Sequence, residues 1–460
     1  MGEIPPIENV PTRPAANVAL SWVLIAAAIL GLVGVDFYAR HHQEADDTAA
    51  LVILTLQAKM LTAISALSPE QVSRSLEEDL NDFAATPALA RALAALNVYV
   101  SGPDGVSRAQ VLLDRRQPSP DDPEDLALHQ TVRRVIEDPG SVTETDERQI
   151  LDGMAWFGKL LVACGRPNGD PLRKEVQRDA FLALGAMLGL FGVAGLATLA
   201  GIVLLVIALI QLSSGKLRIG FGPALGDASI YLQSFAVCLA LIFFIGIGLA
   251  LAGLVHPLIG LAGIFIAYVL GLTWPILRGV PASIAMRDLG FSRGAGWLKE
   301  AGAGIVGYVS MLPVVAMGFF VTLALIAIVQ AIGPEPADGS PEVISHPVAV
   351  WMAHGNVAVR LGVLFMAAGF APFFEEALFR GALLRGVRRK LGPLVSALIV
   401  AFVFAIIHPQ GILLVPALGA LGFGFAMLRE WRGSLIAPMV AHAVHNGTLA
   451  AYLQGFFPDP

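Results

Sequence analysis

The chain has 460 residues, of which 56% are hydrophobic and only 14% are charged, and its mean hydropathy is +0.70. Soluble proteins carry about 25% charged residues, so this composition excludes an ordinary soluble domain and indicates a polytopic membrane protein. The formal net charge of -6 is concentrated in one segment, because residues 40–179 hold 23 acidic and 15 basic side chains.

Windows of about 20 apolar residues predict about nine membrane-spanning helices, and therefore an all-α polytopic transmembrane bundle. The first window is long for the hydrophobic part of a secretory signal, and no small-residue cleavage site follows it. Residues 1–39 are therefore predicted to form a retained signal anchor. The windows cover approximately residues 18–38, 181–212, 229–254, 257–277, 301–332, 350–373, 393–408, 411–428 and 434–454.

A polar insert, residues 40–179, separates the first window from the second. Segments 49–67 and 70–95 within it have apolar residues at helical spacing, and Pro/Asp-rich breaks such as QPSPDDPED follow them. We therefore predict a mostly helical domain outside the membrane. It has no Gly-rich phosphate loop, no His or Cys residues at metal-ligand spacing and no basic stripe. A structural or substrate-gating role is favoured, and nucleic acid is not an expected partner.

Lysine and arginine gather in every second loop of the membrane part. Loops that face the cytoplasm are the basic ones, so this alternation predicts a cytoplasmic N-terminus and an insert outside an inner (plasma) membrane of bacterial type. The basic loops lie at residues 216–218, 278–299, 385–390 and 429–432, and the loops without lysine or arginine lie near residue 256, at 333–349 and at 409–411.

Three charged residues interrupt the apolar stretch FFEEALFRG, residues 373–381. An ionisable group at the middle of a membrane costs about 2.5 to 3.5 kcal/mol on insertion scales, so such groups usually have a function. Glu376 and Arg380 stand four residues apart and can pair on one helix face. Glu375 is left over, because it points about 100° away around the helix.

Two further polar groups lie in predicted spans. His408 ends the apolar run FVFAIIHPQ, and a lone histidine at such a place is more often an interfacial residue than a catalyst. In the last span, HAVHN places His442 and Asn446 four residues apart on one helix face, with His445 facing elsewhere. The alternative interpretation of this second group is hydrogen bonding between helices.

Depth in the membrane connects these groups. Glu375 and His408 lie 16 or 17 residues on either side of the cytoplasmic turn near residues 391–392. At 1.5 Å per residue, both are about 25 Å along their helices from that turn. His442 and Asn446 lie roughly 15 and 21 Å into the last span, counted from the basic loop before it. Three helices are thus expected to bring a carboxylate, two imidazoles and an amide to a similar layer.

This set of side chains suits hydrolysis of an amide bond. A glutamate in a low-dielectric site can take a proton from water, and Glu375 with His408 fits that base. Donors for an oxyanion are also needed, and His442 and Asn446 fit that role. The alternative is zinc bound by His408, His442 and a glutamate, although the HExxH signature is absent. The spacing leaves both mechanisms open.

At this point the residues resemble a known family. EEALFR matches an EExxxR motif, FAIIH at residues 404–408 matches FxxxH, and HAVHN at residues 442–446 matches HxxxN, in that order. Together they are similar to the CAAX-protease and bacteriocin-processing family (CPBP or ABI), intramembrane endopeptidases related to the type II CAAX prenyl endopeptidase. The resemblance covers about residues 300–454. We therefore divide the chain after the insert into membrane spans over 180–299 and a catalytic core over 300–460.

The resemblance implies roles for single residues and an activity. Glu375 would activate water together with His408, and His442 and Asn446 would stabilise the oxyanion. Both a metalloprotease and a metal-free glutamate mechanism are attributed to the family, so zinc stays an alternative. The implied function is hydrolysis of a peptide bond in a membrane-associated peptide or protein. The residues implied to support the site are Glu376, Arg380 and Phe404.

A function from a different class competes with this one. In a non-catalytic membrane scaffold or sensor, the acidic insert would bind a partner and the polar residues would only join helices. Dry, mutually paired side chains would favour the scaffold, whereas access of water to Glu375 would favour the enzyme.

Overall fold

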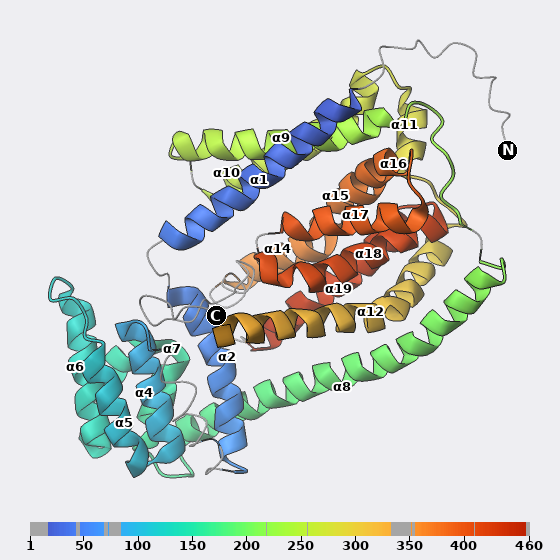
Figure 1. Ribbon diagram of the computed structural model, residues 1–460. Coiled ribbons are helices and arrows are strands. Elements are labelled where there is room, and N and C mark those ends of the chain that lie inside the picture. Colours follow the sequence, from blue (N-terminus) through green and yellow to red (C-terminus); the bar gives the residue numbers. More distant parts are fainter. Residues whose placement is uncertain are drawn as a thin grey trace. The chain divides into compact units, whose positions relative to one another are not determined.

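The computed structural model describes most of the chain, and Figure 1 shows the course of its helices. No strand occurs among the described residues, which confirms the all-α prediction. The predicted loop 333–349 and most of the first half of the predicted helical segment 70–95 lie outside the described residues. The described residues are 17–42, 47–68, 72, 84–217, 219–254, 256–332, 351, 355–408 and 410–456.

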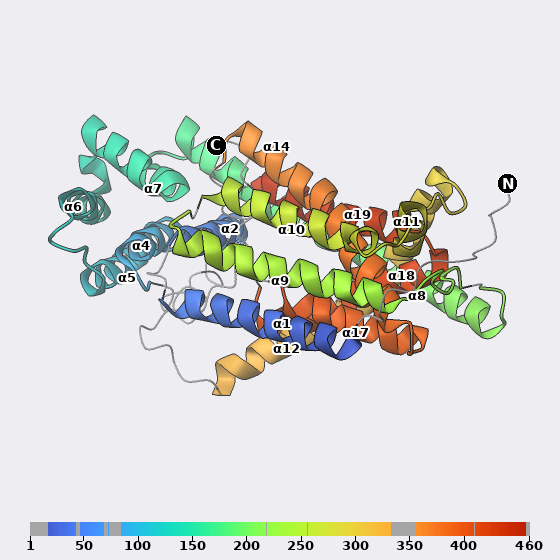
Figure 2. The same cartoon turned by 90° about the horizontal axis from the view of Figure 1, so that it is seen from above.

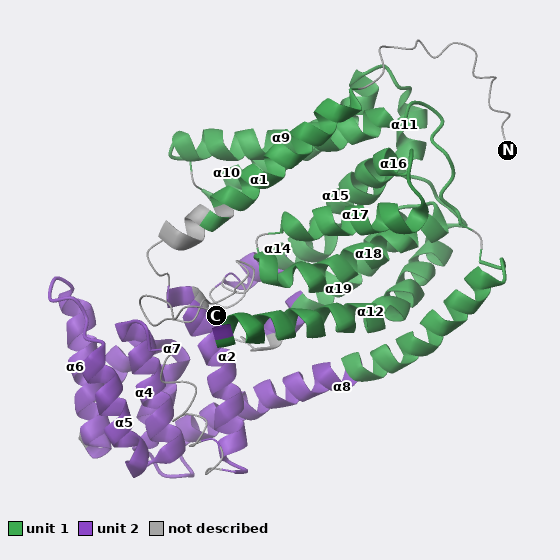
Figure 3. Ribbon diagram, viewed as in Figure 1, with its two compact units in different colours: residues 1–43, 194–331, 362–449 green, residues 44–193, 332–361, 450–460 purple. Residues whose placement is uncertain are grey.

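Two compact units make up the chain, as Figure 3 shows. The long helix α8, Pro171–Ser213, contributes residues to both of them. Unit 1 consists of residues 1–43, 194–331 and 362–449, and unit 2 consists of residues 44–193, 332–361 and 450–460.

Unit 2 is built from short helices around an apolar core of its own, in which Leu93 is fully buried. Local signals start these helices, because Thr86 and Asp122 accept hydrogen bonds from the backbone N–H groups of Leu89 and Asp125. Prolines occupy the first helical position of several helices, where the missing N–H does no harm. With the start of α8, the helices are α2 (Asp47–Ser65), α4 (Pro87–Ser101), α5 (Pro103–Arg115), α6 (Pro123–Glu137) and α7 (Glu144–Cys164).

Unit 1 contains long apolar helices, with α9 packed against α1 and α10, and α17 against α18 (Figures 1 and 2). The helix that carries Glu375 and Glu376 is assembled from α14, α15 and α16 with two π-helical segments between them. The helices are α1 (Val18–His42), α9 (Ser229–Leu251), α10 (Pro257–Leu277), α11 (Ala282–Leu289), α12 (Trp297–Ile332), α14 (Val357–Phe365), α15 (Ala371–Glu376), α16 (Leu384–Val387), α17 (Pro393–Ile406), α18 (Val415–Arg432) and α19 (Ile436–Phe456).

Seven described helical stretches are long and apolar enough to cross a membrane, as judged by length and composition. Two of the nine predicted windows are not among them. Helix α17 has only 14 residues, and α19 includes His442, His445 and Asn446, which lower its hydropathy. The seven stretches are Val18–Val35, Pro171–Ser213, Ser229–Leu251, Leu258–Leu277, Trp297–Ile332, Val357–Val387 and Ile412–Arg432.

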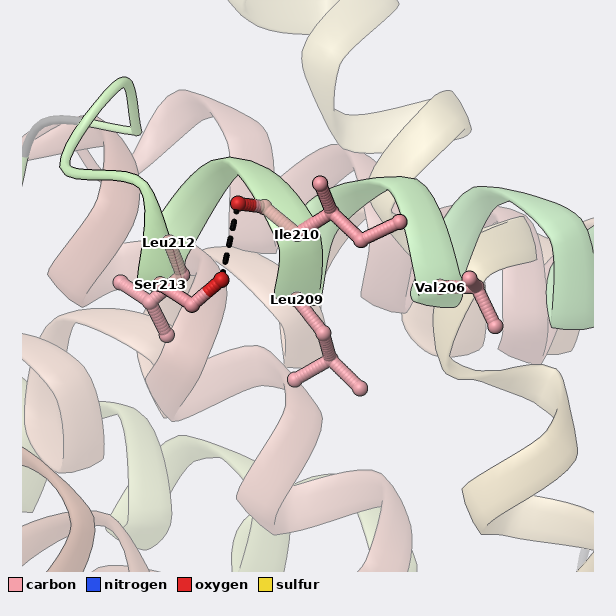
Figure 4. A pocket seen from close by; sticks show the side chains of 5 residues that line it. All are labelled: Val206, Leu209, Ile210, Leu212 and Ser213. Carbon is pink, nitrogen blue, oxygen red and sulfur yellow. Dashed lines mark hydrogen bonds between the residues drawn. The ribbon is translucent and has the colours of Figure 1, made fainter.

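A hollow of about 500 Å³ lies along the last turns of α8 (Figure 4). Its wall is apolar, and the hydroxyl of Ser213 is already used, because it donates to the carbonyl of Ile210 at 3.0 Å. Exposed apolar side chains on a helix of this length are suited to contact lipid. None of the predicted site residues lines this hollow, whose lining residues are Val206, Leu209, Ile210, Leu212 and Ser213.

The first turn of α7 is held by a carboxylate that makes unit 2 sensitive to acid. Asp146 accepts hydrogen bonds from the side chain and the backbone of Thr143 in a capping box, and it pairs with Arg134. Hydrogen bonds from Arg134 and then Thr143 lower the pKa of Asp146 to about 2. Because the pKa is lower in the folded than in the unfolded state, this stabilisation is complete above pH ~4 and declines toward pH ~2.

We therefore expect the melting temperature of the wild type to exceed that of the Asp146→Asn variant at pH 5 and the difference to shrink as the pH falls to 2. The difference in melting temperature is measured by thermal unfolding, monitored by circular dichroism, at several pH values between 5 and 2. A difference that is constant over the whole range would show that the ionised carboxylate contributes nothing.

Candidate active site

The helix that presents the two glutamates is not a regular α-helix. A π-helical segment, Met366–Phe370, precedes α15, and a second one, Ala377–Leu383, follows it. Each π turn inserts an extra residue into the helix and rotates the side chains beyond it, and such turns are frequent at functional sites. Glu375 and Glu376 end the short α-helical stretch between the two segments. Their directions are therefore set by local irregularity that hydrophobic periodicity does not report.

Glu376 and Arg380 form an ion pair that is fully buried. The guanidinium Nη1 lies 2.8 Å from Glu376 Oε1, and both side chains have 0% exposure. Arg380 also donates from Nη2 to the carbonyl of Gly422 on α18 at 2.9 Å. The ring of Phe404 lies against its guanidinium, 4.6 Å from ring centroid to Cζ. The predicted pairing of the two charges is thus present, and its partners come from three helices.

His442 binds the same carboxylate oxygen. Its Nδ1 lies 2.9 Å from Glu376 Oε1, and its ring stacks on Phe425 with centroids 4.9 Å apart. Glu376 Oε1 accepts from Arg380 as well, so it can only be an acceptor toward the histidine. Nδ1 of His442 therefore carries a hydrogen, and Nε2 is the nitrogen that faces Glu375, 3.9 Å from its Oε2.

His408 is oriented in an equivalent way by the backbone. Its Nδ1 contacts the carbonyl oxygen of Phe404 at 2.5 Å, one turn earlier in the same helix. A carbonyl oxygen accepts only, so Nδ1 of His408 also carries a hydrogen. Nε2 is again the nitrogen directed at Glu375, and it lies 3.9 Å from Oε2. The FxxxH spacing thus has a structural reason, because Phe404 supplies both a ring against Arg380 and the acceptor for His408.

Glu375 Oε2 lies at the centre of these groups and is buried without a hydrogen-bond partner. The two imidazole nitrogens that face it are each 3.9 Å away. That distance is too long for a direct hydrogen bond but suits a single bridging water molecule. The side chains of Glu375 and His408 are each 20% exposed, whereas that of His442 is 5% exposed. The side chains of Glu375 and His408 are thus more exposed than that of His442, although Glu375 Oε2 itself is buried.

Asn446 is positioned differently from the other three predicted site residues. Its Nδ2 donates to the carbonyl of Ala367 at 3.0 Å, within the first π-helical segment. It lies one helical turn beyond His442, on the same face of α19. One of its two amide hydrogens is thus used to fasten α19 to the helix with the glutamates, and the second is free for another acceptor.

Several residues that support the site were not identified from the sequence. Gly422 and Phe425 on α18 contact Arg380 and His442, but a glycine and a phenylalanine in an apolar span carry no recognisable signal. His445, predicted to face elsewhere, contacts the hydroxyl of Tyr308 on α12 through its Nδ1 at 3.1 Å. Only contacts between distant segments identify these partners.

The zinc alternative can be compared with the distances. In tetrahedral zinc sites the ligand atoms lie about 2.0 to 2.2 Å from the metal, which places two ligands about 3.4 Å from each other. Glu375 Oε2 lies 3.9 Å from each histidine Nε2, which is wider. Within the described part of the chain, no group of three or more His, Cys, Asp or Glu side chains is arranged to hold a metal ion. This arrangement does not fit a zinc site.

Removing one partner of the buried ion pair should destabilise the protein strongly. Replacement of Arg380 by Met leaves the Glu376 carboxylate in an apolar environment with one charged donor fewer, which typically costs about 3 to 5 kcal/mol. Thermal unfolding in detergent should show a large decrease in melting temperature. The matched control is Arg178→Met, because Arg178 pairs with Asp179 at the surface and such a pair contributes less than about 1 kcal/mol. Equal melting temperatures for the two variants would contradict this account.

Comparison with known families agrees with the motifs. Residues 357–448 match the family model described as type II CAAX prenyl endopeptidase Rce1-like. The matched segment contains Glu375, His408, His442 and Asn446, and the match confirms the resemblance over this part of the chain. No curated protein and no solved structure matches the chain.

Proposed function

We propose that the chain is an intramembrane endopeptidase of the CAAX-protease type. The observation that carries this proposal is the buried Glu375 Oε2, which has no hydrogen-bond partner and faces Nε2 of both His408 and His442. Glu375 Oε2 and His408 Nε2 are both potential acceptors, and a proton-donating molecule between them would satisfy both. A water molecule there would be both the missing partner and the nucleophile.

The water is activated by Glu375. The carboxylate accepts one water proton while His408 Nε2 accepts a hydrogen bond from the other, which orients the oxygen lone pair toward the substrate carbonyl. The water oxygen bonds to the carbonyl carbon and gives a tetrahedral oxyanion. Glu375 then returns its proton to the amide nitrogen, the carbon–nitrogen bond breaks, and a carboxylic acid and an amine leave. No covalent bond to the enzyme is needed.

His442 and Asn446 stabilise the oxyanion in this proposal. Nδ1–H of His442 is bound to Glu376, so Nε2 can donate only if the ring is an imidazolium. Two carboxylates and one guanidinium leave the buried site with one negative charge, and an imidazolium makes it neutral. Asn446 adds its second amide hydrogen from the next turn of α19. Both donors are fixed before substrate binds, which is the condition for effective electrostatic stabilisation.

The substrate that this site suits is a membrane-associated peptide or protein segment. Glu375 and Glu376 lie within a helical stretch that is apolar and long enough to cross a bilayer, so the peptide bond would come to them inside the membrane. We further propose that it reaches the site from the cytoplasmic side and that the 40–179 segment lies on the opposite side. That segment would then select or hold substrate rather than cleave it.

The scaffold alternative assigns the polar residues to helix contacts only. Glu376, Arg380 and His442 do pair with one another and would serve that purpose. Glu375 adds no direct hydrogen bond to that network, and its side chain is 20% exposed. A buried carboxylate oxygen without a hydrogen bond destabilises a purely structural contact between helices, whereas an enzyme can use it to bind water. The environment of Glu375 therefore supports the catalytic proposal.

Replacement of Glu375 by Gln should abolish cleavage with little effect on folding. Loss of a general base lowers a rate by about 10²- to 10⁴-fold, and the amide keeps the shape of the side chain. A substrate is first identified by comparing peptides released in membranes with wild-type protein and with the variant. Cleavage of that peptide by purified proteins is then measured, with Glu144→Gln in unit 2 as the control. Equal activity of the Glu375→Gln variant would exclude the proposed mechanism.

Removal of metal ions should leave the activity unchanged. The proposed mechanism uses only side chains and water, so dialysis against a strong chelator would remove no group that the reaction requires. Turnover of the same peptide is measured before and after dialysis, together with the metal content of the protein. A loss of activity that added zinc restores would favour the zinc mechanism instead.

A further inference from the structure

One end of unit 1 has a strongly basic surface that the proposed proteolysis does not use. It is formed by the loop after α8, by α11 and the loop to α12, and by the loop between α16 and α17 (Figure 1). Its exposed basic residues are Lys216, Arg287, Arg293, Lys299, Arg389 and Lys390.

The carboxylates of the same segments are mostly inside the protein. Asp288 is buried and accepts the hydroxyl of Tyr231 at 2.9 Å. Glu300 is fully buried and binds Arg432 through both oxygens, at 2.7 and 2.9 Å.

Glu430 is buried as well and pairs with Arg388 at 2.6 Å. Asp227 is exposed, and both of its oxygens accept hydrogen bonds from Ser229. Burial and pairing therefore remove most of the negative charge from this surface and leave the exposed cations uncompensated.

The opposite end of the same helices carries no such charge. The loop between α9 and α10, residues 252–256, and the segment after α17, residues 407–411, contain no lysine, arginine, aspartate or glutamate. Among these segments, the exposed cations therefore lie at one end of the helices. A charge pattern of this kind fits a partner that is itself negative and lies in the plane of one membrane boundary.

Exposed apolar side chains stand among these cations. Trp297 and Leu298 begin α12 with 63% and 89% exposure, directly before Lys299. Met286 is 43% exposed directly before Arg287 on α11. A tryptophan and a leucine next to a lysine suit the boundary between headgroups and acyl chains, where a charged headgroup and hydrocarbon are both in reach. An acidic soluble protein would not need this apolar component.

We propose that this surface binds the headgroups of anionic phospholipids. The cations are adjacent in sequence to the buried pairs that join the helices, since Lys299 precedes Glu300 and Arg389 follows Arg388. Repulsion among the exposed cations opposes that packing, and a bound phosphate group relieves it. Anionic lipid therefore stabilises the ends of the helices that form the candidate active site, whether or not the chain cleaves peptides.

The test compares lipid association in vesicles that contain the whole protein. Spin-labelled phosphatidylglycerol and spin-labelled phosphatidylcholine are added in turn, and the motionally restricted fraction of each gives its relative association constant. We expect a preference of at least about fivefold for phosphatidylglycerol at low salt, the effect of one lysine or arginine near a surface. The preference should disappear in 1 M salt, where the screening length is about 3 Å.

Variants locate the binding surface. Replacement of Arg287, Arg293, Lys299, Arg389 and Lys390 by Gln should abolish the preference, whereas replacement of the three arginines by Lys should retain it. The control replaces three exposed cations of unit 2, Arg115, Arg148 and Lys174, by Gln and should leave the preference unchanged.

Circular dichroism shows whether each variant is folded. If the Gln variant does not fold, the Lys variant, which keeps the positive charges, still tests the proposal. Equal association of the two lipids with the wild type would overturn the proposal. A preference that survives in the folded Gln variant, or that the unit 2 control removes, would overturn it as well.

Discussion

The carboxylate of Glu376 is the group on which the site depends. It is fully buried in a segment apolar enough to cross a membrane, and it accepts hydrogen bonds from Arg380 and from His442 through one oxygen. A buried charge of this kind is tolerated only when its partners are held in place. Arg380 in turn binds Gly422, so the helix with the glutamates, α18 and α19 are fixed relative to one another by a single charged network.

This network decides how the neighbouring groups are oriented. Because Glu376 occupies Nδ1 of His442, the opposite nitrogen is directed at Glu375. The backbone of Phe404 does the same for His408. Two histidines on different helices thus present the same nitrogen to one carboxylate oxygen, each oriented by a second group behind it. Glu376 is held by two partners through Oε1, whereas Glu375 has no direct hydrogen bond.

The same rule operates at the basic end of unit 1. Asp288, Glu300 and Glu430 are buried with partners, as Glu376 is. Glu375 has no direct hydrogen bond and its side chain is 20% exposed, and the loop cations lie on the surface. The cost of an unpaired charge in an apolar medium accounts for the pairing of these buried carboxylates.

The sequence by itself determined the all-α membrane class, because long apolar windows leave no other backbone arrangement in lipid. It also determined the pairing of Glu376 with Arg380 and the similar depth of Glu375 and His408, since both follow from the fixed rise and period of a helix. It did not reveal the two π-helical segments, because a local insertion leaves no trace in hydrophobic periodicity. Nine spans were predicted, and seven described helical stretches qualify by length and composition.

Only the tertiary structure decided which nitrogen of each histidine faces Glu375, that Glu376 holds His442, and that Asn446 binds Ala367. These contacts join segments up to 79 residues apart, and helical spacing carries no information on which faces of separate helices meet. The residue types could therefore be predicted from the sequence, whereas the contacts that each of them makes were decided only by the packing of the helices.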